Sequence, residues 1–210
     1  MTHPAEEQTF EKPATAAYPI SELISQRWSP RAYSERSVDR YLLAQLFEAA
    51  RWAPSSSNEQ PWAFFIAEKG TEGWQKLFDT LVPFNQDWVK LAPVLVLGLA
   101  RKNFAGNGTP NRHALYDLGQ AVGGLLAEAT ALGLSVHQMA GFDPDRARVA
   151  LHIPDNYELG AAMTIGYPAK AEILPDGLRA RELAPRQRHP IESFVYEGDF
   201  GKPAQFPPSR

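Results

Sequence analysis

One long helical segment, residues 114–132, constrains the fold more than any other part of the chain. Its apolar residues recur at helical spacing, and they are Leu118, Ala121, Val122, Leu125, Leu126 and Ala129. These side chains cover most sides of the helix, which Gly133 ends. A helix of this kind has to be enclosed by other elements, so we expect it in a core or at an interface between subunits.

The other elements are expected to surround this helix in layers. Apolar runs predict four strands, over residues 62–67, 94–97, 134–139 and 159–167. Helical spacing predicts helices over residues 20–27, 38–53 and 73–81, a short helix before Pro93 and another opened by Asp143 and Pro144. Ser37 is the expected cap of the second helix, and residues 82–85 and 101–113 are expected loops. Because strands and helices do not alternate regularly, this order predicts an α+β layer fold.

The composition favours one domain without a membrane segment. The chain has 210 residues, of which 44% are hydrophobic, and this is enough for one sizeable core. Its 21 basic and 24 acidic residues nearly balance, so no overall field favours nucleic acid or an anionic membrane. The longest apolar run, residues 92–100, is about half of a membrane span, and the polar start is unlike a signal peptide. The absence of cysteine excludes disulfides and thiolate chemistry, and we expect a cytoplasmic protein.

Three regions are expected along the chain. Residues 1–19 lack periodicity and predict a flexible N-terminal arm, whereas residues 20–192 predict the folded domain. Residues 193–210 form a C-terminal extension with aromatic side chains among polar and proline residues, namely Phe194, Tyr196, Phe200 and Phe206. This extension is too apolar to remain free in water, so we expect it to wrap a partner chain.

Two basic segments predict an anion site. Arg27 and Arg31, with Ser29 between them, place two guanidinium groups and a hydroxyl within five residues, which suits a phosphate dianion. Arg186 and Arg188 form a second, proline-bounded basic segment. By themselves such arginines are often solvated charges at helix ends or in loops, and this alternative stays open for both segments.

A polar segment between a predicted helix and a predicted strand is a second candidate for binding. It runs from Pro54 to Trp62 and contains three serines, an asparagine and a glutamine. Its hydroxyl and amide groups suit hydrogen bonding to a flat heterocycle, and loops held by rigid neighbours are common binding elements. Serine and asparagine also form ordinary turns, which is the alternative. Together with the arginines, the segment predicts a phosphorylated aromatic cofactor.

Other cofactor and metal sites are not indicated. The histidines His3, His113, His137, His152 and His189 show no HExxH or similar spacing, so no metal site is expected. His137 is expected to be a strand residue and not a catalyst. Because no G-x-G-x-x-G follows a strand, a nicotinamide cofactor would have to bind transiently.

Five landmarks occur along the chain in an order that resembles the nitroreductase family. They are Arg27-x-Ser-x-Arg31, Ala-Pro-Ser-Ser-x-Asn58-x-Gln-Pro-Trp62, Asp117-Leu-Gly119, Gly141-Phe142-Asp143 and Arg186-x-Arg188. The resemblance covers roughly residues 20–195. It implies an α+β fold with a central, mainly antiparallel sheet flanked by helices, in a domain-swapped homodimer. It also implies FMN as the cofactor, with each flavin held between two protomers.

The resemblance assigns expected roles to particular residues. The phosphate end and the ring edge are expected at Arg27, Trp28, Ser29, Arg31, Arg186 and Arg188. The loop that reaches the flavin from the partner is expected at Pro54, Ser55, Ser56 and Asn58. Asn85 matches an amide near the pyrimidine edge. The segment near the flavin N5 is expected at Gln138, Met139, Ala140 and Gly141, where a backbone N–H supplies the contact.

Three departures from the family pattern concern the substrate more than the fold. Ala140 stands where members often carry Glu, and Trp88 stands where some carry Lys. Gly123 and Gly124 replace an asparagine-containing stretch. Phe84, Trp88 and Phe104 are candidates to line a substrate pocket, although aromatic residues are more often core residues.

The expected activity follows from the cofactor. The resemblance implies hydride transfer from NADH or NADPH through flavin N5 to a small conjugated acceptor, a nitroaromatic or a quinone, by a ping-pong mechanism. FMN carries the chemistry, so no catalytic side chain is required. A specialised branch of the family is the first alternative, with reductive dehalogenation, enoate reduction or flavin fragmentation. The second is a non-catalytic FMN-binding protein.

Overall fold

A four-stranded antiparallel sheet forms the centre of the molecule. The computed structural model describes residues 11–208. The strands are β1 (Trp62–Glu68), β2 (Val94–Arg101), β3 (Ser135–Met139) and β4 (Tyr157–Gly166). They lie in the order β1-β2-β4-β3, and every neighbouring pair is antiparallel. The predicted α+β class with an antiparallel sheet is therefore confirmed.

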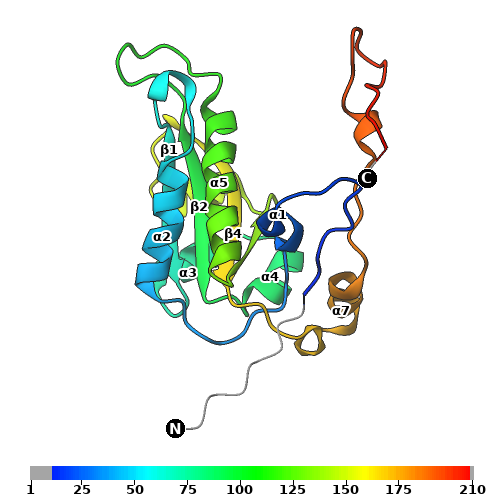
Figure 1. Ribbon diagram of the computed structural model, residues 1–210. Coiled ribbons are helices and arrows are strands. Elements are labelled where there is room, and N and C mark those ends of the chain that lie inside the picture. Colours follow the sequence, from blue (N-terminus) through cyan, green and yellow to red (C-terminus); the bar gives the residue numbers. More distant parts are fainter. Residues whose placement is uncertain (1–10, 209–210) are drawn as a thin grey trace.

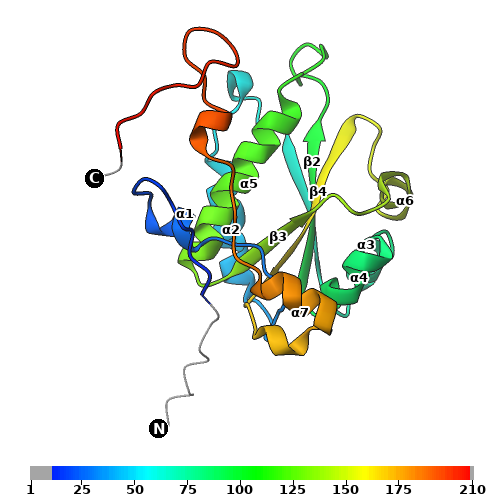
Figure 2. The ribbon, with the colours of Figure 1, turned by 90° about the vertical axis from the view of Figure 1, so that its right-hand side faces the viewer.

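Helices cover both faces of this sheet (Figure 2). Alternate residues of β2 point to opposite faces, so Val94 and Val96 join one apolar core while Leu95 and Leu97 join the other. The first core lies under α2 (Arg40–Arg51) and α5 (Ala114–Ala131). The second lies under α3 (Glu72–Phe78), α4 (Pro83–Val89), α6 (Pro144–Ala150) and α7 (Asp176–Leu183). The two cores explain why β2 is almost continuously apolar.

The long helix α5 is buried on the sides that face α2 and the sheet, and it is open on one side. A Cβ atom added at Gly124 would lie 2.9 Å from the carbonyl oxygen of Ala49, so this glycine allows close packing against α2. On the open side, Leu115 is 50% exposed and Tyr116 is 68% exposed. Gly119 and Gly123 continue this open stripe, since nothing lies within 4 Å of a Cβ added at either residue. The helix is thus not enclosed within one chain.

Three details of the predicted elements are corrected. Helix α2 begins at Arg40, and its cap is Asp39 instead of Ser37, because the Asp39 carboxylate accepts a hydrogen bond from Tyr41 N at 2.8 Å. The predicted loop 82–85 is wrong beyond Val82, since Pro83 occupies the first turn of α4 and fixes a helical φ. Helix α7 was not predicted, because its apolar residues show only a weak helical period.

The first and last segments of residues 11–208 lie at the outside of the molecule (Figure 1). Helix α1 (Glu22–Gln26) lies beside α5. The described residues also form the short 3₁₀ turns η1 (Ser56–Asn58), η2 (Ala171–Ile173) and η3 (Ile191–Ser193). Residues 1–10 of the predicted arm lie outside the described residues, and residues 11–19 form neither helix nor strand. The C-terminal extension projects from the body, with Phe194 and Phe200 exposed at its surface. The proposed division into arm, domain and extension stays a prediction.

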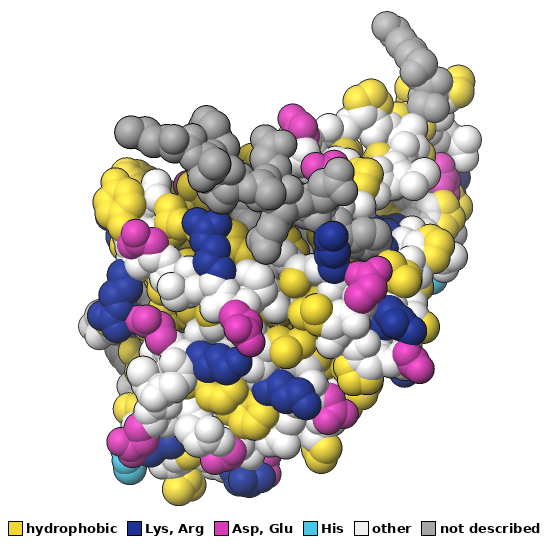
Figure 3. Space-filling view, turned by 90° about the horizontal axis from the view of Figure 1, so that it is seen from below, with side chains coloured by type: hydrophobic (Ala, Val, Ile, Leu, Met, Phe, Trp, Pro, Cys, Tyr) yellow, Lys and Arg dark blue, Asp and Glu magenta, His cyan; other side chains and the backbone are white. Residues whose placement is uncertain are grey.

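The molecular surface shows no single-sign charge on the face seen in Figure 3, where basic and acidic side chains are interspersed. Within residues 11–208 no helix combines the length and the apolar character that a membrane crossing requires. The same part of the chain contains no group of three or more His, Cys, Asp or Glu side chains able to hold a metal ion.

Candidate functional site

Arg27, Arg186 and Arg188, here called the arginine cluster, lie close together although they come from opposite ends of the chain. Burial, and then the charges of Arg186 and Arg188, lower the pKa of Arg27. Burial, and then the charge of Arg188, lower the pKa of Arg186. Among the ion pairs of residues 11–208, none joins these guanidinium groups to a carboxylate. Like charges held together in this way favour binding of an anion.

Backbone contacts hold the arginine cluster in place. Arg186 Nη1 donates hydrogen bonds to the carbonyl oxygens of Lys12 and Ser25, each at 2.7 Å. Arg27 Nη1 donates to Ser29 Oγ at 3.2 Å, which joins two residues of the predicted anion motif. Arg188 is exposed, and within the described part of the chain its guanidinium donates only to the neighbouring carbonyl of Gln187, at 2.6 Å. Among residues 11–208, most guanidinium donors of the cluster have no hydrogen-bond partner, so they can bind a ligand.

A cleft of about 370 Å³ opens beside this cluster. Arg27 and Trp28 line it together with Lys12, and its other wall comes from the end of α5 and the start of β3. Lys12 Nζ lies 5.2 Å from the centre of the Trp28 ring. Lys12 belongs to the predicted arm and was missed as a site residue, because a single lysine in a segment without periodicity gives no signal.

Arg31, the second arginine of the predicted anion motif, packs toward the core. It is half-buried, and its guanidinium lies 6.0 Å from the centre of the buried Trp88 ring. Burial lowers the pKa of Arg31, whereas the nearby Glu182 raises it. Glu182 was also missed, since its sequence neighbourhood has no motif and its contact with Arg31 spans 151 positions.

His137 packs beneath these residues on β3. The centre of its ring lies 4.5 Å from the centre of the Trp88 ring, and Nδ1 donates a hydrogen bond to the carbonyl oxygen of Pro30 at 2.9 Å. Burial, assisted by the charges of Arg31 and Arg27, lowers the pKa of His137 to about 4. The ring is therefore neutral near pH 7, and its place in a strand is as predicted.

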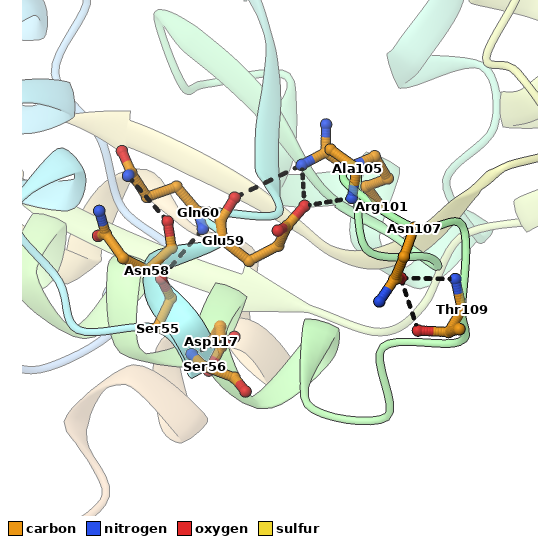
Figure 4. A network of polar contacts seen from close by, with 10 residues as sticks. All are labelled: Ser55, Ser56, Asn58, Glu59, Gln60, Arg101, Ala105, Asn107, Thr109 and Asp117. Carbon is orange, nitrogen blue, oxygen red and sulfur yellow. Dashed lines mark hydrogen bonds and ion pairs between the residues drawn. The ribbon is translucent and has the colours of Figure 1, made fainter.

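A second group of predicted residues forms the serine loop, residues 55–60 (Figure 4). Ser56 N donates to the carboxylate of Asp117 at 3.1 Å, and Gln60 N donates to Ser55 Oγ at 3.0 Å. Ser57, Asn58 and Gln60 have φ values of 54°, 54° and 49°. Non-glycine residues rarely adopt this backbone conformation, so the contacts have to hold the loop in a strained shape.

Glu59 ties the serine loop to the long loop 101–113 (Figure 4). Glu59 Oε1 accepts hydrogen bonds from Arg101 Nη2 at 2.6 Å and from Ala105 N at 2.7 Å. The Glu59 side chain is only 14% exposed, so the ion pair is partly shielded from solvent. The pairing of Glu59 with Arg101 could not be predicted from local patterns, because the partners are 42 positions apart along the chain.

The segment expected near N5 follows β3. Gln138 and Ala140 are exposed, whereas Met139 is buried. The Gly141 carbonyl accepts hydrogen bonds from Asn85 Nδ2 at 2.9 Å and from Val82 N at 3.0 Å. A Cβ atom at residue 141 would lie 2.5 Å from Asn85 Nδ2, so this contact requires glycine. The structure thus brings Asn85 to the predicted N5 segment.

The predicted substrate-pocket residues do not meet within one chain. Phe84 is 43% exposed on α4, with the guanidinium of Arg181 lying 5.1 Å from its ring centre. Trp88 is fully buried in the core, so it lines no pocket of a single protomer. Phe104 belongs to the loop 101–113, and this loop lies at the opposite end of the molecule from α4 (Figure 1).

The arginine cluster and the serine loop also lie apart, at opposite ends of α5. Ser56 contacts Asp117 in the first turn of this helix, whereas Arg27 shares its cleft with Thr130 near the last turn. At 1.5 Å per residue, these two contact points are roughly 20 Å apart along the helix axis. One chain therefore does not place Pro54, Ser55, Ser56 and Asn58 beside the arginines.

Comparisons with known proteins show what this chain is similar to. A sequence model described as the nitroreductase family matches residues 24–167. A solved structure described as an oxidoreductase containing FMN is 35% identical, with a TM-score of 0.85 over 96% of this chain and 100% of the other. An NADH dehydrogenase of Thermus thermophilus is 29% identical over 80% of this chain and 91% of its own length. Iodotyrosine deiodinase 1 of Sus scrofa is 27% identical, over 74% of this chain and 63% of its own length.

Proposed function

This chain belongs to the nitroreductase family, and from that premise we propose that it is an FMN-dependent oxidoreductase that acts as a homodimer. The observation that carries the proposal is the arginine cluster. Three guanidinium groups lie together without an acidic partner among the described residues, and such an arrangement suits the phosphate dianion of FMN. We assign Arg27, Arg186 and Arg188 to that phosphate, with Trp28 and Ser29 beside it.

The ring of the cofactor has a second set of residues to contact. Arg31 supplies a guanidinium whose Nη1 has no hydrogen bond to another side chain in the described chain, and Asn85 supplies an amide. We assign both to the pyrimidine edge of the flavin, where donors stabilise negative charge. The segment 138–141 supplies the backbone beside N5. Its exposed Ala140 leaves room at the position where other family members often carry Glu.

When bound, FMN supplies the redox chemistry by taking hydride from NADH or NADPH and passing it to a small conjugated acceptor, such as a nitroaromatic or a quinone. The protein binds and orients the two substrates in turn at one pocket, which predicts ping-pong kinetics. No side chain has to move a proton. His137 is kept neutral by burial, so near pH 7 it carries no imidazolium proton that it could donate as a general acid.

The shared site follows from the placement of its halves at opposite ends of α5. If two copies of α5 pack antiparallel and cross at Gly123, with Leu115, Tyr116 and Gly119 of the open stripe against the second half of the partner helix, the first turn of one helix lies beside the last turn of the other. This packing brings the serine loop of one protomer to the arginine cluster of its partner. The small glycines permit close approach, and the exposed apolar residues gain burial.

The C-terminal extension is part of the same proposal. Its exposed Phe194 and Phe200 point to a surface that it covers on the partner chain. This exchange of segments would make the dimer domain-swapped, as expected from the sequence. A cytoplasmic location stays a prediction.

A test of the function begins with the purified protein. We expect it to be yellow, to release FMN and not FAD on denaturation, and to bleach under anaerobic NADH or NADPH. The colour returns when a quinone or nitroaromatic is added. A colourless protein that does not take up added FMN contradicts the proposal, and a holoprotein that never bleaches favours a non-catalytic FMN-binding protein.

One alternative activity has a specific observation in its favour. The similarity to iodotyrosine deiodinase 1 keeps reductive dehalogenation open as a specialised branch. A panel of quinones, nitroaromatics and halogenated phenols, assayed on the reduced holoprotein, separates the two activities. Release of halide at a rate above quinone reduction would favour the alternative.

A further inference from the structure

Glu182, near the end of α7, is a buried acidic residue that the proposed function leaves unused. Its side chain is 1% exposed, although carboxylates are rarely buried unless they are paired. Arg186 of the arginine cluster follows Glu182 by four positions along the chain. The buried Glu182 side chain therefore connects the C-terminal arginines of the candidate FMN site with Arg31.

One oxygen of Glu182 holds the backbone of the anion motif. Oε1 accepts hydrogen bonds from Arg31 N at 2.8 Å and from Ala32 N at 3.0 Å. The main-chain oxygen of Glu182 also accepts a hydrogen bond from Lys12 Nζ at 2.5 Å. Glu182 thus joins the N-terminal segment, the Arg31 segment and the C-terminal segment.

The other oxygen faces Arg31 without a hydrogen bond. Oε2 is buried, has no hydrogen-bond partner among residues 11–208, and lies 3.8 Å from Arg31 Nη1. In the same part of the chain, the buried Arg31 Nε has no hydrogen-bond partner either. The pair is close enough for strong electrostatic interaction, yet the guanidinium keeps donors that a ligand can use. The carboxylate therefore restrains Arg31 without saturating it.

We infer that Glu182 is a positioning residue that directs Arg31 to the pyrimidine edge of FMN and limits the positive charge there. The inference rests on the proposed function. Reduction of the flavin adds negative charge at N1 and O2, so a cation beside this edge favours the reduced form. A carboxylate 3.8 Å from that cation opposes its effect and keeps the reduction potential of the bound FMN low.

The sign of the effect distinguishes this role from a purely structural one. Glu182→Gln keeps the size of the side chain and an oxygen for the two backbone N–H groups, but it removes the charge. The reduction potential of the bound FMN then shifts to more positive values. Arg31→Gln leaves the carboxylate without its neighbouring guanidinium, so the potential shifts to more negative values. A loss of packing alone does not predict that the reduction potential shifts in opposite directions in Glu182→Gln and Arg31→Gln.

The experiment is an anaerobic reduction of each FMN-loaded protein in the presence of a reference dye, with FMN content measured separately. Glu172→Gln, an exposed glutamate in η2, is the matched control and is expected to keep the wild-type potential. Glu182→Asp restores the charge and is expected to return the potential toward wild type. An unchanged potential in FMN-loaded Glu182→Gln, or in Arg31→Gln if the first variant does not fold, overturns the inference. Failure of the wild-type protein to bind FMN instead contradicts the proposed function itself.

Discussion

The two ends of α5 carry the two halves of the proposed site, and they are built in opposite ways. At the last turn, the arginine cluster gathers positive charge with no carboxylate paired to it among the described residues. At the first turn, the serine loop is held by the hydrogen bond from Ser56 N to Asp117 and by the ion pair of Glu59 with Arg101, and it has three residues at positive φ. The arginine cluster thus keeps hydrogen-bond donors that a ligand can use, whereas the serine loop has a backbone conformation held by its own contacts.

This difference indicates how the halves divide the work. Charge-assisted hydrogen bonds at the arginine end supply most of the affinity for a phosphate. The serine loop contributes few charges, so its part is to shape the pocket around the ring. Since each chain carries both halves at a separation of roughly 20 Å along α5, the site depends on a second chain to join them.

We expect the largest effect on FMN binding from a substitution that separates the two protomers and changes no residue of the arginine cluster or the serine loop. Gly123→Glu adds a charge to the open stripe of α5, where a single chain has space for it and where Glu favours the helix over Gly. In an antiparallel dimer the same carboxylate would be buried without a partner. We expect a folded monomer whose FMN affinity falls on the order of a hundredfold or more. Sedimentation velocity with detection of flavin absorbance measures both quantities.

Gly106→Glu is the control for this substitution, because nothing lies within 4 Å of a Cβ added at that loop position. It is expected to remain dimeric and yellow. A Gly123→Glu protein that stays dimeric and keeps FMN would show that the open stripe of α5 is not the interface.

The second prediction concerns His137, which packs beneath Arg31, and the free energy of unfolding at acid pH. The unfolded chain protonates His137 near pH 6.5, whereas burial keeps the folded side chain neutral down to about pH 4. Its contribution to stability is therefore complete above pH 6.5 and is lost as the pH falls toward 4. The loss amounts to about 3 kcal/mol per protomer.

Urea denaturation of the FMN-free protein between pH 7 and 4 measures this dependence. His137→Gln removes the titrating group, and the slope of unfolding free energy against pH should become shallower. His152→Asn is the control, since His152 is exposed and Asn tolerates its positive φ. Equal slopes for the wild type and His137→Gln would show that this histidine does not protonate on unfolding as described.

The smallest expected effect concerns the serine loop. Asp117→Ala leaves Ser56 N without its acceptor and should lower the free energy of unfolding by about 1–3 kcal/mol. Asp117→Asn keeps an oxygen at the same place and should cost less. FMN affinity should fall in the same order, because the loop loses its fixed shape. The account of the loop fails if the two substitutions are equivalent in both urea denaturation and FMN titration.

Much of the fold was predictable because it rests on local patterns. The apolar run of β2 and the spacing in α5 identify buried elements directly, and Asp143 caps α6 as expected. The start of α4 was missed because proline at a first helical turn resembles a loop signal. Helix α7 was missed because few apolar residues mark its buried side.

The site was only partly predictable, for a different reason. Its ligand-facing arginines and serines occur in compact motifs, which the sequence shows. The residues that hold them, Glu182, Asp117, Glu59 and Lys12, act across distances of 42 to 170 positions along the chain. Such pairings arise from the packing of the fold and leave no local pattern.

The most direct test of the shared site mixes two damaged subunits. One chain carries Arg27→Ala and Arg188→Ala, and the other carries Ser55→Ala and Asn58→Ala. Each parent homodimer should bind FMN at least roughly tenfold more weakly than wild type. After the two are refolded together, each heterodimer contains one intact site and one doubly damaged site. The account predicts that FMN binding at wild-type affinity returns to about a quarter of all sites for random pairing. A mixture that binds no better than its parents, or a monomer that retains FMN, would contradict the claim that the site is built from two chains.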